Sequence, residues 1–478
     1  MAATDEPELR GRRSPYADGP PAEDLVVEIP SLEGFGLPEV RRIVVVAVVL
    51  AASIVARVAR SLPALRRPVA AWLATAASEG VVDGFERLGP TFVKVGQLIA
   101  SAPGVFPPVL ADAALRCLDD VPPFDGATAR AVVEEDLGAP IDELFASFDE
   151  EPLAAASIGQ VHGCTLRDGR EAVVKLQRPG IRARMTTDLR ILHRFARVLH
   201  HRTATGRNAN ALGLIEDLHT NTCRELVPAL EAHRQDRYRS ALAASGDNTG
   251  VTVPEVHWDH CGPRVICMER MRGVPLDDFA TIRRRGADGA LVLRRVVKAW
   301  LEACIVDGLF HGDVHAGNVW LLDDGRASFL DFGIMGELDE PWRDLIRSLF
   351  RSTAIDGDFS HLARSFKAVG AFPADVGSDE EVGLRMQLVF GPVVEAPLLE
   401  VSLGTVLKNV VDLMDQYAGG AGTPKELLLI IKQLLYFERY AAELAPDWII
   451  AKDLYLVRNL FPDEVARKVE QLGITLPD

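Results

Sequence analysis

The chain is short of cysteine and of positive charge. It has six cysteines in 478 residues, and no two of them form a C-x-x-C pair. Neither a disulfide framework nor a zinc site is indicated, and this cysteine usage fits a reducing cytoplasm. Lys and Arg total 52 against 68 Asp and Glu, which gives a formal net charge of −16. A nucleic acid is therefore not expected as the main partner, because binding its phosphate backbone requires a positive surface.

Long apolar runs are also scarce. No run of 18 apolar residues follows residue 57, so the C-terminal half is not expected to cross a membrane. An apolar stretch of fourteen residues, 43–56, is flanked by Arg41, Arg42 and Arg57. Such a helix extends only about 21 Å, against roughly 30 Å for the hydrocarbon core of a bilayer. We expect residues 41–70 to form a basic apolar helix, either peripheral on an anionic membrane surface or buried in the globular body.

The remaining composition is that of a globular protein with several packed units. Hydrophobic residues make up 48% and charged residues 25% of the chain. Residues 1–40 are rich in Pro, Asp, Glu and Gly, and we predict a disordered tail. Residues 71–125 are predicted to be mostly helical and to end at the boundary VPPFD. Strand patterns then occur within 126–271, and 272–478 is chiefly helical.

Several local patterns predict individual elements. Strand-like alternation in SIGQVHGCTL and EAVVKLQ surrounds Asp168 and Gly169, a pair that strongly favours a β-hairpin, and the second strand ends near Lys175. Further short strands are expected in PRVICMERM, VWLLDD and ASFLDFG. Thr423 and Glu426 form a capping-box pattern that predicts a helix start. The resulting fold class is α+β.

The stretch FHGDVHAGNVWLLDDGRASFLDFG carries residues suited to phosphoryl transfer. Asp313 and Asn318 are five positions apart, the separation in a kinase catalytic loop, and the D-F-G of Asp331 follows at the end of a short strand. Asn318 and Asp331 offer the oxygen ligands that Mg²⁺ prefers, which leaves Asp313 to orient or deprotonate an acceptor hydroxyl or a water. Lys175, upstream on its strand, would contact the α and β phosphates of ATP or ADP.

Two histidines, His311 and His315, flank Asp313 in the same loop. A site of this kind needs no imidazole ligand, so we expect them to form structural hydrogen bonds within the loop instead of binding a metal.

The chain has no G-x-G-x-x-G ahead of the strand lysine. The corresponding position reads AAASIGQVH, in which Ala154, Ala155, Ala156 and Ser157 are the candidates for nucleotide contact. Alanine restricts the backbone more than glycine does, so this loop should be stiffer than a glycine-rich one.

Together these motifs resemble the ABC1/UbiB/ADCK family of atypical kinases, also called the AarF family. The Ala-rich loop AAASIGQVH, the strand AVVKLQRPG, the loop FHGDVHAGN and the D-F-G all look like signatures of that family. So does FVKVGQ, because Lys94 to Gln97 matches the K-x-G-Q motif of the family's helical N-terminal extension. The resemblance covers roughly residues 84–341 and extends more loosely to the C-terminus.

The resemblance implies a protein-kinase-like bilobal fold, with a small β-rich N-lobe, a larger helical C-lobe and the helical K-x-G-Q extension. In the family this extension blocks access for a protein substrate, so a protein substrate is not expected. Lys94 and Gln97 would project into the nucleotide site. Ala155 and Ala156 would lie over the phosphates.

Two further assignments follow from the same resemblance. Lys175 would pair with an acidic helix residue, for which Glu231 in ELVPALEAHR is the best candidate. The backbone near Glu269 to Met271 would receive the adenine.

The chain departs from the family pattern at two positions. Where the family usually carries E-x-D, this chain has Glu225 followed two residues later by Val227. Where the family commonly has E-A-x-N, Arg234 replaces the asparagine. Loss of a carboxylate at Val227, near the K-x-G-Q lysine, is expected to loosen the contact that holds the inhibitory extension in place. Pro228, in the same stretch, predicts that a helix starts or bends there.

The function that we expect is that of an atypical Mg²⁺-dependent kinase or ATPase that binds ATP or ADP. The family resemblance implies a role in isoprenoid-lipid or quinone metabolism, with a lipid or isoprenoid-type partner. A second interpretation is a small-molecule phosphotransferase similar to aminoglycoside or choline kinases, whose H-G-D-x-H-x-x-N loop is also matched by residues 311–318. A third is a nucleotide-gated, non-catalytic lipid-binding scaffold.

Overall fold

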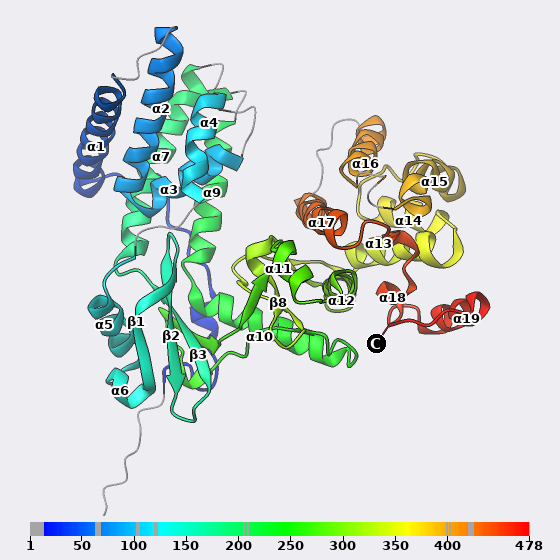
Figure 1. Cartoon of the computed structure of the whole chain (residues 1–478). Helices are drawn as coiled ribbons and strands as arrows, with labels where there is room; N and C mark the ends of the chain where they lie inside the picture. The colour runs from blue at the N-terminus through cyan, green and yellow to red at the C-terminus, as the bar shows by residue number, and fades with distance from the viewer. Residues whose placement is uncertain are drawn as a thin grey trace, which may run out of the picture. The chain divides into compact units, whose positions relative to one another are not determined.

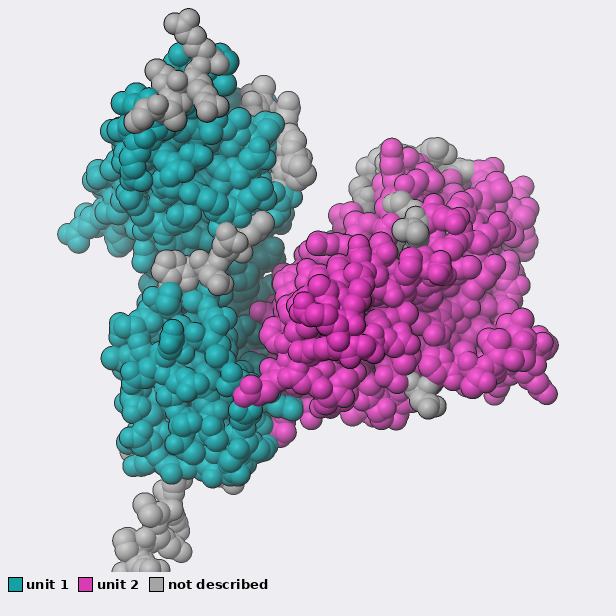
Figure 2. Space-filling view, in the orientation of Figure 1, with its two compact units in different colours: residues 1–231, 256–270 teal, residues 232–255, 271–478 magenta. Residues whose placement is uncertain are grey.

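The computed structural model describes most of the chain, in two compact units (Figures 1 and 2). The described residues are 14–62, 68–101, 106–118, 123–203, 206–207, 210–397, 400, 403–418 and 425–477. Unit 1 comprises Met1–Glu231 and Val256–Arg270, and unit 2 comprises Ala232–Glu255 and Met271–Asp478.

Unit 1 begins with a layer of helices that includes the predicted helical extension. These are α1 (Leu37–Ser61), α2 (Val69–Leu88), α3 (Pro90–Ser101) and α4 (Pro108–Ala114), followed later in the chain by α7 (Ile181–Arg202) and α9 (Ala211–Glu225). Phe85, Leu88 and Phe92 pack in the core between α2 and α3. Gly80 and Gly84 let α2 approach α1 closely, since a Cβ at either position would clash with Ile54 or Leu50.

The helix predicted over 41–70 begins earlier and ends sooner than expected, because α1 runs from Leu37 to Ser61. Its N-terminus extends past the apolar run, and there the backbone N–H of Gly36 donates to Glu39 at 2.8 Å. The helix has 25 residues, and an 18-residue window within it has a mean hydropathy of 2.3, so it is long and apolar enough to cross a membrane by length and composition.

The sheet of unit 1 contains the predicted hairpin. Its strands are β1 (Phe145–Ala155), β2 (Gly159–Leu166), β3 (Glu171–Gln177) and β5 (Val265–Glu269), antiparallel in the order β1-β2-β3-β5. The turn between β2 and β3 contains Gly169 with φ +89°, a conformation that glycine adopts readily. The helices α5 (Gly126–Leu137) and α6 (Ile141–Leu144) pack against β1.

The predicted disorder of residues 1–40 is wrong for the part that the structure describes. Tyr16 is buried and its hydroxyl donates to Asp24 at 2.9 Å, while the Ser14 hydroxyl donates to the carbonyl of Cys261. Arg190 contacts both the Ser31 carbonyl and the Glu39 carboxylate. The segment lacks a core of its own and is ordered by contacts with residues distant in the sequence. Residues 1–13 lie outside the described part.

The boundary between the units differs from the predicted boundary at residue 271. It falls inside α10 (Pro228–Ala244), directly after Glu231, so that residues 232–255 belong to unit 2. The helix starts at Pro228, as predicted, because proline is well tolerated in a first helical turn.

Unit 2 is chiefly helical, as expected, and its described residues include two small sheets. The strands β4 (Val251–Thr252), β9 (Ala327–Phe329), β8 (Val319–Leu322) and β6 (Gly273–Pro275) form one sheet in this order, and β10 (Met335–Glu337) pairs with β7 (Leu309–His311). The helices are α11 (Phe279–Arg284), α12 (Gly289–Glu302), α13 (Glu340–Phe350), α14 (Ser360–Ala368), α15 (Asp379–Glu395), α16 (Leu403–Ala418), α17 (Lys425–Leu444), α18 (Leu454–Val457) and α19 (Pro462–Leu472). The capping residue predicted at Thr423 lies outside the described residues.

The core of unit 2 forms around α12. Trp300 is 1% exposed and packs edge-on against Phe310 and Phe437, which come from β7 and α17. This packing places the end of β7, and the loop after it, beside α17.

All six cysteines are buried and free. No two of them are joined in a disulfide. Burial raises the pKa of Cys117 to about 11 and that of Cys261 to about 12, so neither thiol is activated as a nucleophile.

Candidate active site

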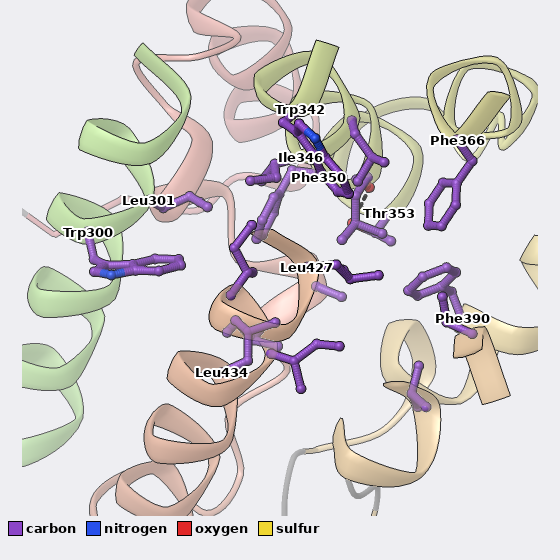
Figure 3. A pocket seen from close by; sticks show the side chains of 18 residues that line it. Trp300, Leu301, Trp342, Ile346, Phe350, Thr353, Phe366, Phe390, Leu427 and Leu434 are labelled. Atoms are coloured by element: carbon purple, nitrogen blue, oxygen red, sulfur yellow. Dashed lines mark hydrogen bonds between the residues drawn. The ribbon is translucent and has the colours of Figure 1, made fainter. Parts of the chain in front are cut away.

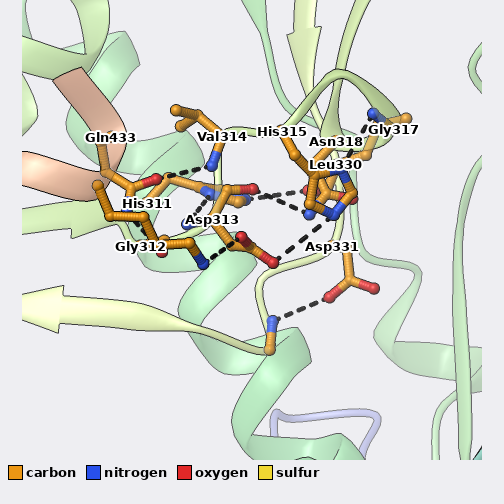
Figure 4. A network of polar contacts seen from close by, with 12 residues as sticks. His311, Gly312, Asp313, Val314, His315, Gly317, Asn318, Leu330, Asp331 and Gln433 are labelled. Carbon is orange, nitrogen blue, oxygen red and sulfur yellow. Dashed lines mark hydrogen bonds and ion pairs between the residues drawn. The ribbon is translucent and has the colours of Figure 1, made fainter. Parts of the chain in front are cut away.

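The loop after β7 is held by a buried histidine (Figure 4). The Nδ1 of His311 accepts a hydrogen bond from the backbone N–H of Asp313 at 3.2 Å, so the proton of the neutral ring is on Nε2, which donates to the Leu330 carbonyl at 3.0 Å. Burial lowers the pKa of His311, which favours this neutral form. The structural role predicted for His311 is therefore confirmed.

His315 lies on the other side of Asp313. Its Nδ1 accepts a hydrogen bond from the Gly317 N–H at 3.1 Å, and its Nε2 is 3.6 Å from the Oδ2 of Asp313. This second histidine also acts within the loop, as expected.

Asn318 and Asp331, the two predicted metal ligands, both have their side chains oriented by the backbone (Figure 4). The Nδ2 of Asn318 donates to the Asp313 carbonyl at 3.0 Å, which leaves its Oδ1 as the atom that can bind a cation. Asp331 has φ +56°, and its Oδ1 accepts from the Gly333 N–H at 3.1 Å. The left-handed region is unfavourable for a residue with a Cβ, and such conformations concentrate at functional sites.

Two protein ligands are enough for a magnesium ion but too few for a metal whose ligands all come from the protein. Among the described residues, no group of three or more His, Cys, Asp or Glu is arranged to hold a metal. Mg²⁺ typically takes one or two protein oxygens and completes its octahedron with phosphate oxygens and water. Asn318 and Asp331 could supply the protein oxygens of such a site.

The lysine–glutamate pair predicted in unit 1 is present. The Nζ of Lys175, on β3, lies 2.6 Å from the Oε1 of Glu231, in the first turn of α10. Val161 and Ile266 are its neighbours in register on the adjacent strands. The Glu231 side chain is only 11% exposed, so the pair is shielded from water more than a surface ion pair is.

The Ala-rich loop is a tight turn between β1 and β2. β1 includes Ala154 and ends at Ala155, and the N–H of Ala156 donates to the Gly159 carbonyl at 2.8 Å. Arg178, which the sequence analysis did not single out, donates through Nε and Nη2 to the Ala156 carbonyl at 3.1 and 3.0 Å. The turn, which includes Ser157, is thus held by a side chain, and its residues 155–158 contain no glycine.

The K-x-G-Q residues make contacts inside unit 1. The Nζ of Lys94 lies 2.7 and 2.6 Å from the two carboxylate oxygens of Glu225, so the replacement of the family aspartate by Val227 leaves Lys94 with a close carboxylate partner. The Nε2 of Gln97 donates to the Cys117 carbonyl at 2.9 Å. The expected projection of both side chains into a nucleotide site stays a prediction.

The second departure from the family pattern also has a defined contact. The Nη1 of Arg234 donates to the carbonyl of Gly333, the glycine of D-F-G, at 3.0 Å. α10 is thereby joined to the segment that carries Asp331.

The adenine-contact residues predicted from the resemblance are divided between the units. Glu269 is the last residue of β5 and pairs with Ala172 in unit 1. Met271 opens the second segment of unit 2.

Two residues of α17, which no sequence motif indicated, also contact the loop. Lys432 places its Nζ 2.8 Å from the Oδ1 of Asp313. Gln433 donates to the Gly312 carbonyl at 2.8 Å and accepts from the Val314 N–H at 2.9 Å. The available signal was the polar pair Lys-Gln inside the apolar run LLLIIKQLLYF, because a buried amide must find hydrogen-bond partners.

Two features together define a protein-kinase-like protein: a four-stranded antiparallel sheet whose strand lysine pairs with a helix glutamate, and a helical unit that carries an aspartate–asparagine loop and D-F-G. Residues 116–366 match the ABC1 atypical kinase-like domain, and residues 386–448 match the UbiB helical domain. The chain belongs to the ABC1/UbiB family of atypical kinase-like proteins.

Individual relatives agree with this assignment. The chain is 39% identical over 386 residues to "Uncharacterized protein Rv0647c" of Mycobacterium tuberculosis, covering 80% of this chain and 78% of the relative. It is 32% identical over 388 residues to "Probable protein kinase UbiB" of Erwinia tasmaniensis, covering 80% and 70%. Among solved structures it is similar to a Mycobacterium tuberculosis protein titled as the Rv3197–erythromycin complex, with a TM-score of 0.50, 27% identity, and coverage of 72% of this chain and 85% of that one.

Proposed function

We propose that the protein is a Mg²⁺-dependent, ATP-binding atypical kinase or ATPase. The observation that carries the proposal is the arrangement of Asp313, Asn318 and Asp331 within unit 2, with the Asn318 amide and the Asp331 carboxylate both oriented by backbone hydrogen bonds. When bound, Mg²⁺ would neutralise charge on the transferred phosphoryl group. Asp313 would hold the acceptor hydroxyl or water and accept its proton.

The contacts to the nucleotide itself are assigned to the residues that the family resemblance indicates. Lys175 would contact the α and β phosphates, and the 2.6 Å ion pair with Glu231 would keep its side chain in place. The stiff turn at Ala155 and Ala156 would lie over the phosphates. The adenine would bind the backbone near Glu269 and Met271.

An apolar cavity in unit 2 supports a lipid or isoprenoid-type partner (Figure 3). It has a volume of about 130 Å³ and is lined by apolar side chains, among them Trp342, Phe350, Phe366, Phe390, Leu427 and Leu434. An engineered apolar cavity of about 150 Å³ in another protein stays dry and binds benzene. The cavity therefore has room for about one isoprene unit, the end of an isoprenoid chain, but not for a whole polyprenyl tail.

The test is Mg²⁺-dependent ATP hydrolysis by the purified protein, with and without phosphatidylglycerol vesicles that contain a short isoprenoid alcohol. We expect turnover that the vesicles stimulate and that Asp331→Asn reduces by roughly a hundredfold or more, since the variant removes a carboxylate from the metal. Asp324→Asn, in the exposed turn between β8 and β9, is the matched control and should leave turnover unchanged.

Nucleotide binding is measured in parallel. Lys175→Ala and Asp331→Asn should each weaken Mg²⁺–ATP binding, and binding that neither variant affects would contradict the proposal. Tight nucleotide binding without turnover in any condition would favour the nucleotide-gated lipid-binding scaffold. Transfer of phosphate to a soluble amino alcohol or sugar would favour the small-molecule phosphotransferase.

A further inference from the structure

The loop that carries Asp313 contains no cationic side chain of its own. Residues 310–318 read FHGDVHAGN, without lysine or arginine, and the imidazole of His315 is 3.6 Å from the carboxylate. The close positive charge comes instead from Lys432 on α17, 119 positions later, at 2.8 Å from the Oδ1 of Asp313. Lys432 lies in the segment that matches the UbiB helical domain, and Asp313 lies in the ABC1 domain. The two domains thus meet at the proposed catalytic aspartate, inside unit 2.

The position of Lys432 is set by its neighbours on the same helix. The fully buried Gln433 is bonded to the backbone on both sides of Asp313, through the Gly312 carbonyl and the Val314 N–H. Two turns later the hydroxyl of Tyr440 donates to the Val314 carbonyl at 2.9 Å. These three hydrogen bonds fix the register of α17 against the loop, so that the residue beside Gln433 faces Asp313.

The Lys432 side chain itself remains accessible. It is 45% exposed, and its Nζ lies 5.9 Å from the centre of the Tyr436 ring. An ion pair this exposed contributes only about 0–1 kcal/mol to stability. The contribution of Lys432 to the stability of the fold is therefore small. Its ammonium group is, however, accessible to a substrate.

We propose that Lys432 is a further catalytic residue, which binds the phosphoryl group during its transfer; the proposal rests on the proposed phosphotransfer function. An acceptor oxygen hydrogen-bonded to Asp313 stands about 3–3.5 Å from the phosphorus that it attacks. An ammonium group 2.8 Å from the same carboxylate is therefore within a side-chain rotation of the equatorial phosphoryl oxygens.

The reaction balances without any further reactant. The acceptor oxygen forms a bond to the γ phosphorus, the bond from that phosphorus to the β–γ bridging oxygen breaks, and ADP leaves with the electron pair. The acceptor proton passes to Asp313. Lys432 stays protonated throughout, and its charge offsets the negative charge on the transferred group.

The first experiment measures nucleotide affinity, which does not depend on turnover. Binding of Mg²⁺–ADP and of a Mg²⁺–ATP analogue with a non-cleavable β–γ link is measured for the full chain and its variants. Lys432→Met should weaken binding of the triphosphate at least about fivefold and binding of the diphosphate less than about twofold. The reason is that only the triphosphate carries the group that Lys432 contacts. Lys175→Ala should weaken both nucleotides, and Lys408→Met, an exposed lysine on α16, should weaken neither.

The second experiment measures steady-state ATP turnover. Lys432→Met should lower kcat at least about tenfold and should raise KM for ATP only by the factor by which it weakens binding of the ATP analogue, the pattern of a contact that is present in the bound state and strengthens in the transition state. Lys432→Arg, which keeps the charge, should retain more activity. Alkylation of Lys432→Cys with bromoethylamine rebuilds a lysine-like ammonium and should restore turnover.

The outcomes separate this inference from the proposed function. A wild-type protein that binds no Mg²⁺–nucleotide would overturn both. A wild-type protein that binds and turns over ATP, with Lys432→Met behaving as Lys408→Met does, would overturn the role of Lys432 alone. Lys432→Met that weakens both nucleotides equally would also overturn it, because that result indicates a structural disturbance of the loop. If Lys432→Met fails to fold, the comparison of Lys432→Arg with alkylated Lys432→Cys decides the question.

Discussion

At the scale of single residues, the site depends on side chains whose geometry is set by the backbone. Asp331 adopts φ +56° and is held there by the Gly333 N–H, and the Asn318 amide is oriented by the Asp313 carbonyl. Holding groups in place before a ligand arrives lowers the reorganisation needed on binding. In unit 1, Gly96 of the K-x-G-Q motif has a steric role, because it lets α3 approach Cys117 closely.

Gly96 is expected to be indispensable for packing. A Cβ at this position would overlap the Sγ of Cys117, a buried residue that is only 2% exposed. Gly96→Ala should therefore destabilise the protein by about 1–3 kcal/mol, the usual cost of overpacking, as measured by urea unfolding. The double variant Gly96→Ala/Cys117→Ala removes the overlapping sulfur and should recover part of the loss. An unchanged unfolding midpoint for the single variant would show that α3 has room to shift.

At the scale of elements, α17 and α1 each present two different faces. α17 lines the apolar cavity with Leu427 and Leu434 and contacts the loop that carries Asp313 with Lys432 and Gln433. A ligand in the cavity would thus contact the helix that positions Lys432. This arrangement connects the proposed apolar partner with the proposed chemistry through one rigid element.

α1 packs one face on the globular body and exposes the other. Arg42 pairs with Asp188 at 2.7 Å and Arg57 with Glu79 at 2.8 Å, so two of the three flanking arginines already have acidic partners in unit 1. Arg41 is exposed. These contacts hold α1 on unit 1. If the helix meets a membrane, we therefore expect it to lie on the membrane surface and not to leave the unit and span the bilayer.

The exposed apolar face of α1 is expected to mediate vesicle binding. Val44 is 59% and Val48 61% exposed. Val44→Asp/Val48→Asp should lower binding to phosphatidylglycerol vesicles at least about tenfold. The double variant removes apolar area that would be buried in the membrane, and it adds negative charge that the anionic lipid repels. Co-sedimentation measures this, with Leu472→Asp on α19 as the control. Equal vesicle binding by all three proteins would assign membrane contact to another surface.

At the scale of the whole molecule, each unit has its own core, and unit 1 buries several histidines. Burial lowers the pKa of His162, His219 and His260 below the ordinary value, opposed for His162 and His260 by hydrogen bonds to backbone carbonyls. In each case the folded state favours the neutral ring.

The stability of unit 1 should consequently fall in mild acid. A histidine whose pKa is depressed in the folded state binds fewer protons there than in the unfolded chain, so stability is full above about pH 6.5 and is lost as the pH decreases. Each such histidine contributes a slope of at most about 1.4 kcal/mol per pH unit. Urea unfolding between about pH 7.5 and 5 measures the slope, which His162→Asn should reduce. A free energy of unfolding that stays constant over this range would contradict the expectation.

The sequence by itself determined the features that depend on neighbouring residues. The Asp168-Gly169 turn produced the predicted hairpin, and the spacing of Asp313 and Asn318 placed their side chains within one loop. Such features follow from local backbone geometry, which a few residues are enough to specify. The pairing of Lys175 with Glu231 was also predicted, but through family resemblance and not through spacing.

Only the tertiary structure decided the contacts between distant segments. Lys432 reaches Asp313 across 119 positions, and Arg190 holds Glu39 across 151 positions. Neither contact leaves a periodic trace in the sequence, because each depends on how two separately formed elements pack their faces together. Neither the ordered structure of the N-terminal segment nor the lysine beside Asp313 could be predicted from the sequence, because both depend on packing between elements.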